Sequence, residues 1–165
     1  MANIKGISGL DTKRILSAKF YLFKYISPHP RSDGSNLYYN LYPLVFTLGK
    51  LNSNLFQGID FHYMPVKQRI VLLDNLRQIT PSLKSSPGRF VSIFKQLMVS
   101  VRKYRPALAA FRRYNISSIV GGKMIRIMPG DWDEVIQIPI EKFFSGDARV
   151  SPKKVQRDML ARQRM

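Results

Sequence analysis

The sequence predicts an α+β fold. Three features indicate it: segments rich in aromatic and branched residues come first, segments with helical periodicity follow, and two strand-like segments come near the end. We therefore expect a small curved antiparallel sheet, or an SH3-like barrel, with a helical insertion. The length of 165 residues fits one domain. We expect an N-terminal arm over residues 1–14, a single α+β domain over 15–146 and a basic C-terminal tail over 147–165.

Residues 15–26, 37–48 and 55–64 are the three strands expected in the first part of the chain. Each segment combines aromatic with branched residues, and stretches rich in proline, glycine, serine and asparagine separate them. Pro43 lies inside the second segment. Because proline cannot donate to a strand ladder, Pro43 indicates an edge position or a bulge.

Pro65 marks the start of the first expected helix, because proline favours the first turn of a helix. The side chains of Val66, Ile70, Leu73 and Leu76 then follow at helical spacing. They predict a helix with one apolar side.

The second half of the chain continues with helices and ends with strands. After a break at residues 80–88, residues 90–104 carry the clearest amphipathic pattern, with one continuous apolar stripe. Residues 107–114 predict one or two further helical turns. Residues 124–128 and 132–138 are expected as two final strands on either side of a turn.

Charge is the strongest compositional feature. The chain has 27 Lys and Arg against 10 Asp and Glu, a net charge of +17, which attracts polyanions such as nucleic acid. The absence of cysteine excludes disulfides, thiolate metal sites and cysteine nucleophiles. No apolar run approaches the roughly 20 residues that a membrane-spanning helix needs, so no membrane partner is expected.

The basic residues are most concentrated between Asp74 and Asp131, a stretch without any acidic residue. Arginine forks mixed with tyrosine rings suit phosphate contacts and base stacking. We expect the stretch to contact a polyanion or an acidic partner, with a merely solvated basic face as the alternative. The expected contact residues here are Arg89, Lys95, Arg102, Lys103, Arg105, Arg112 and Arg113.

The basic tail adds Lys153, Lys154 and Arg157 to the expected contact residues. Apolar residues in the tail, Val155 among them, have the spacing of a short amphipathic helix. We interpret the tail as an arm that becomes ordered on a neighbour. The alternative is a solubilising tail.

Candidate catalytic groups are few. Asp60 and His62 lie two residues apart in an expected strand and so share a face, but no nucleophile accompanies them, which favours a structural histidine. Asp131, Asp133 and Glu134 form the only acidic cluster; a metal-dependent nuclease is the hypothesis they suggest, and ordinary turn chemistry is the preferred explanation. We predict no catalytic residue, no metal site and no cofactor.

Several motifs together resemble a family of small proteins from large contractile-tailed bacteriophages, often labelled DNA end protector or virion structural protein. The resemblance covers about residues 20 to 140 and differs from the family pattern at Asn40 and Met64. Its motifs are YYNLYPLV at 38–45, GIDFHYMP at 58–65, RIVLLD at 69–74, RRY at 112–114 and the Pro129–Trp132–Pro139 region.

The resemblance implies a non-enzymatic virion component, assembled in the host cytoplasm as part of a multi-subunit structure. The preferred hypothesis is a protein of the tail, baseplate or neck that bridges neighbouring virion proteins and contacts DNA through a basic surface. The alternative is a free nucleic-acid-binding protein such as a DNA end protector.

Overall fold

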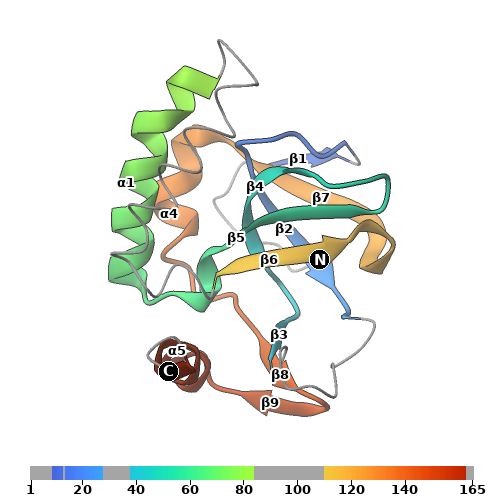
Figure 1. The fold of residues 1–165 in the computed structure, drawn as a ribbon, viewed down its shortest axis with the longest axis vertical. Coiled ribbons are helices and arrows are strands. Elements are labelled where there is room, and N and C mark those ends of the chain that lie inside the picture. The colour runs from blue at the N-terminus through green and yellow to red at the C-terminus, as the bar shows by residue number, and fades with distance from the viewer. Residues whose placement is uncertain (1–8, 13, 28–37, 84–109, 163–165) are drawn as a thin grey trace.

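Two antiparallel sheets form the frame of the molecule in the computed structural model, which describes residues 9–12, 14–27, 38–83 and 110–162 (Figure 1). The larger sheet has six strands in the order β1-β7-β2-β4-β5-β6, and the smaller has three in the order β3-β8-β9. Both sheets are open and curved, which confirms the predicted α+β class. The strands are β1 Gly9–Thr12, β2 Phe20–Tyr25, β3 Tyr39–Asn40, β4 Leu44–Lys50, β5 Leu55–Asp60, β6 Phe111–Asn115, β7 Ile119–Ile127, β8 Phe143–Ser145 and β9 Ala148–Val150.

The three predicted N-terminal strands are present as the centre of the larger sheet. β2 pairs with β4, and β4 pairs with β5. The predicted strand 37–48 divides at Pro43 into β3 and β4, which belong to different sheets. The alternation along β2 places Phe20 and Leu22 in one core and Tyr21 and Phe23 in another, so this strand is buried on both faces.

Helix α1, Val66–Leu83, begins directly after Pro65, as predicted, and packs on the larger of the two cores. Leu73 and Leu76 are buried, but Val66 and Ile70, which were expected on the same apolar side, are 39% and 40% exposed. The buried side is instead centred on Leu72, Leu73 and Leu76, with the arginine at position 69 one turn before them. The predicted helix 90–104 lies outside the described residues.

Two predictions for the second half of the chain are wrong. Residues 107–114 were expected to be helical, but residues 111–114 lie in strand β6, because pairing with β5 stacks Tyr114 on Phe56 at 5.4 Å between ring centroids. Residues 132–138, expected as a strand, begin with the short helix α4, Trp132–Val135, after a 3-10 turn at Pro129–Asp131. Helical spacing places Trp132, Val135 and Ile136 together in the core, and the Trp132 indole donates to the Ile127 carbonyl at 3.0 Å.

Both ends of the described chain take part in the fold. Residues 9–12, within the segment predicted as an arm, form edge strand β1 on β7. In the segment predicted as a tail, β9 pairs with β8, and helix α5, Pro152–Arg162, buries Val155 completely. Among the described residues, no helix is long and apolar enough to cross a membrane.

Candidate functional site

The predicted contact residues fall into two groups. Arg89, Lys95, Arg102, Lys103 and Arg105 lie outside the described residues, so the structure does not place them. The other five lie on β6 and α5, and they are Arg112, Arg113, Lys153, Lys154 and Arg157.

Arg112 and Arg113 are neighbours on β6 and therefore point to opposite faces of the sheet. Arg113 is exposed. The Arg112 guanidinium lies over the buried Tyr63 ring, with its carbon 4.1 Å from the ring centroid, in cation–π geometry. The structure therefore does not bring these two arginines together on one surface.

The three basic residues of α5 also have different surroundings. Lys154 donates to Asp158 at 2.6 Å, and Asp158 accepts a second hydrogen bond from the Tyr38 hydroxyl at 2.6 Å. These two bonds lower the pKa of Asp158 to about 2. Lys153 and Arg157, one turn apart, line a pocket beside α5; the Arg157 side chain is 75% exposed, and its Nε lies 3.7 Å from the Asp158 carboxylate.

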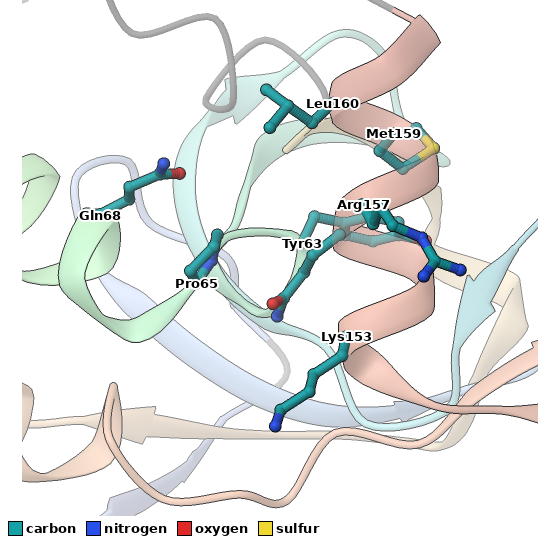
Figure 2. A pocket seen from close by; sticks show the side chains of 8 residues that line it. Tyr63, Pro65, Gln68, Lys153, Arg157, Met159 and Leu160 are labelled. Carbon is teal, nitrogen blue, oxygen red and sulfur yellow. The ribbon is translucent and has the colours of Figure 1, made fainter.

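The pocket lies between α5 and the start of α1 and has a volume of about 260 Å³ (Figure 2). Figure 2 shows Pro65 and Gln68 across the pocket from the α5 side chains. The Gln68 side-chain oxygen is buried and has no hydrogen-bond partner within the described part of the chain, so a bound group can donate to it. None of the described residues that line the pocket is acidic; they are Tyr63, Pro65, Gln68, Lys153, Gln156, Arg157, Met159 and Leu160.

Hydrogen bonds to backbone carbonyls hold the pocket walls together. The Gln156 amide of α5 donates to the carbonyls of His62 and Met64, both at 3.2 Å. The buried Arg69 side chain of α1 donates to the Met64 carbonyl at 2.7 Å and to the Glu141 carboxylate at 3.1 Å. α5 and α1 are thus both tied to the 3-10 turn Phe61–Tyr63 between β5 and α1.

Asp60 and His62 lie at the start of this 3-10 turn, and both are completely buried. Asp60 accepts from the His62 backbone N–H at 3.1 Å, and the Asn40 amide donates to His62 Nδ1 at 2.9 Å. Burial, assisted by the positive charge of Arg69, holds the pKa of His62 well below its ordinary value. Burial raises the pKa of Asp60 to about 6. A neutral, hydrogen-bonded and inaccessible imidazole fits the structural role favoured by the sequence.

The acidic residues around Trp132 do not converge on a metal position. Asp133 forms a bidentate pair with Arg77 of α1, with both N–O distances at 2.8 Å, and this pairing lowers the pKa of Asp133. Within the described ranges, no group of three histidine or acidic side chains could hold a metal ion. The nuclease hypothesis therefore gains no support from this cluster.

Sequence reasoning missed the two glutamines of the pocket and the way its walls meet. Gln68 and Gln156 carry no motif, and they line the same pocket only because α5 folds back onto the 3-10 turn. Arg69 was detectable, because it precedes Leu72, Leu73 and Leu76 at the spacing of one helix face.

One comparison with known proteins gives a match. Residues 3–159 match the model of the family described as Phage T4 terminal DNA protecting protein, which is nearly the whole chain. No curated protein and no solved structure matches.

Proposed function

We propose that this chain, which belongs to the family of phage T4 terminal DNA protecting proteins, is a non-enzymatic bacteriophage protein that binds DNA ends and shields them from nucleases. The family match over residues 3–159 carries the proposal. It favours the DNA end protector, which the sequence analysis gave as its alternative, over a bridging role in the tail, baseplate or neck. That bridging role stays a prediction.

The charge of the protein supports DNA as the partner. A net charge of +17 concentrates phosphate groups around the molecule, and each phosphate contact releases counterions from DNA. Lys153 and Arg157 supply such contacts at a pocket whose described lining residues include no acid. Occupying an end is sufficient for protection, so the proposed activity involves no bond cleavage.

The pocket gives the proposed contact a defined shape. Lys153 and Arg157 lie one turn apart on α5 but extend their charged groups to different sides of the helix, so each suits a separate phosphate (Figure 2). Met159 and Leu160 offer apolar surface to a sugar or a base. The Gln156 and Arg69 hydrogen bonds keep α5 and α1 in place around it, so the contact surface is preorganised.

The test is protection of linear duplex DNA from a double-strand exonuclease. The wild-type protein should slow digestion, and its affinity should fall steeply with salt. The double charge reversal Lys153→Glu/Arg157→Glu should weaken protection by on the order of 10-fold or more, because two phosphate contacts become repulsive. The matched control Lys50→Glu/Lys123→Glu makes the same change of net charge at exposed positions away from the pocket and should lose far less.

Wild-type protein that leaves digestion unchanged at low salt would overturn the proposed function. Equal losses in the two double variants would overturn the role of the α5 surface. Circular dichroism of both variants checks that the fold is intact. A virion location is part of the proposal, and absence of the protein from purified particles by mass spectrometry would contradict it.

A further inference from the structure

The small sheet presents a row of side chains that the pocket does not use. β3, β8 and β9 lie together at one end of the molecule, near α5 and remote from β1 (Figure 1). In this sheet Tyr39 pairs with Phe144, and Phe144 pairs with Arg149, so these three side chains form one row across three strands. The alternate row, Asn40–Phe143–Val150, faces inward: Phe143 is fully buried in the core.

The two aromatic rings of the outer row are stacked. The Tyr39 and Phe144 centroids lie 5.5 Å apart with an angle of 19° between the ring planes, and both side chains are partly exposed. β3 is an outer strand of this sheet, so Tyr39 lies at the end of the row. A flat aromatic surface at the edge of a sheet can be extended by one more flat ring.

Positive charge flanks the rings. Arg149 lies across from Phe144 and is exposed. Lys142, which directly precedes β8, is exposed, and its Nζ is 5.5 Å from the Tyr42 ring centroid. Glu141, which precedes Lys142, is turned inward to Arg69, and the exposed Asp147 lies in the turn between β8 and β9. Rings beside a guanidinium and an ammonium complement a base beside its phosphate.

Duplex DNA offers such a ring surface in one place only. Along the duplex each base is covered on both faces by its neighbours, whereas the last base has one free face. The phosphates that link nucleotides are alike near an end and in the interior, so contacts to them do not by themselves mark an end. A stacking surface therefore supplies the preference for ends that a net positive charge lacks.

We propose that Tyr39 and Phe144 form a platform on which the terminal base of a DNA end stacks, with Arg149 and Lys142 holding its phosphates. The proposal rests on the proposed function and adds to it the feature that the protein recognises. The proposed occupant is a nucleotide of DNA, because the row combines flat rings with positive charge. If the row bound a protein instead, the terminal base of DNA would not stack on it.

The experiment places the fluorescent base 2-aminopurine at the terminal position of a duplex and, in a second duplex, at an internal position. Wild-type protein should quench the terminal probe by stacking and leave the internal probe unchanged. Unchanged terminal fluorescence at saturating protein overturns the platform, and this measurement needs no variant.

Two variants then separate the platform from general DNA binding. Tyr39→Leu/Phe144→Leu keeps apolar side chains but removes both rings, and should lower the affinity ratio of linear to closed-circular DNA by on the order of 10-fold. Its affinity for the closed circle should stay at the wild-type value. The control Tyr39→Phe/Phe144→Tyr keeps both rings and should keep the wild-type ratio and quenching.

The outcomes distinguish the two proposals. If wild-type protein fails to protect linear DNA, the proposed function fails. If wild-type protein protects and Tyr39→Leu/Phe144→Leu protects and quenches equally well, the function stands and the platform is overturned.

Discussion

Replacing Arg69 by methionine should destabilise the protein strongly, because Arg69 is 1% exposed and its guanidinium joins three segments of the chain. Its Nε donates to the Met64 carbonyl at 2.7 Å, one terminal nitrogen donates to the Ile136 carbonyl at 2.9 Å, and the other donates to Glu141 at 3.1 Å. Methionine fills much of the same volume but leaves two carbonyls and a carboxylate without these donors.

The magnitude follows from the groups left behind. Breaking a buried ion pair by removing one partner costs about 3–5 kcal/mol, and the unpaired carbonyls add to that loss. The apolar contacts of the new methionine offset part of it. We expect the free energy of unfolding to fall by about 4 kcal/mol in Arg69→Met. In the double variant Arg69→Met/Glu141→Gln the loss should be smaller, because no buried negative charge remains.

Arg77→Met is the matched control, with the same substitution two turns further along α1. Arg77 is paired with Asp133, but the two side chains are 36% and 65% exposed. An exposed pair contributes less than about 1 kcal/mol, so this variant should unfold close to the wild type. The assay is urea unfolding followed by the fluorescence of Trp132, the single tryptophan, which is 3% exposed. Equal losses in the two single variants, or no recovery with Glu141→Gln, would refute the reasoning.

Two further predictions concern the larger sheet and the residues beneath the pocket. In Gly58→Ala the added Cβ would lie 2.2 Å from the Val45 side chain and 2.8 Å from the Phe46 carbonyl oxygen. The free energy of unfolding should therefore fall by about 2 kcal/mol in the same assay. A loss below about 0.5 kcal/mol, the usual effect of a surface change, would contradict this. Burial raises the pKa of Asp60 from 3.8 to about 6, so the folded state binds this proton more tightly than the unfolded chain and the contribution of Asp60 to stability falls as pH rises from 4 to 6. Asp60→Asn should therefore gain up to about 3 kcal/mol relative to the wild type between pH 4 and pH 7, and a difference that does not change with pH would contradict the burial of an ionised carboxylate.

The sequence predicts the strands of the sheet centre better than the elements around them. β2, β4 and β5 are dense in aromatic and branched residues, and β4 and β5 pair across a short turn, so local patterns are sufficient. β6 pairs with β5 across a separation of more than fifty residues, and its apolar residues fit a helical turn equally well. Trp132 was assigned to a strand because a short apolar run does not distinguish strand from helix, and packing decides it.

The candidate sites depend even more on long-range contacts. The basic stretch predicted that Arg112 and Arg113 act together, but the alternation of a strand separates them. The pocket joins Tyr63 with Arg157, and the aromatic row joins Tyr39 with Phe144. Each pair meets only after the whole fold has formed, so no spacing in the sequence reveals it.

The strand order of the larger sheet has a consequence for folding kinetics. β2, an inner strand, pairs with β7 through Phe20 and Ile127, which are more than a hundred residues apart, whereas β4 and β5 are joined by a short turn. The chain loses conformational entropy in closing such a large loop before the β2–β7 contacts stabilise it, and folding rates fall as contacts become less local. The β4–β5 hairpin with the start of α1 can therefore collapse first, while β2 keeps an unpaired edge until β7 arrives. During that interval the aromatic residues of β2 are accessible to other chains, so concentrated refolding is expected to lose material to aggregation.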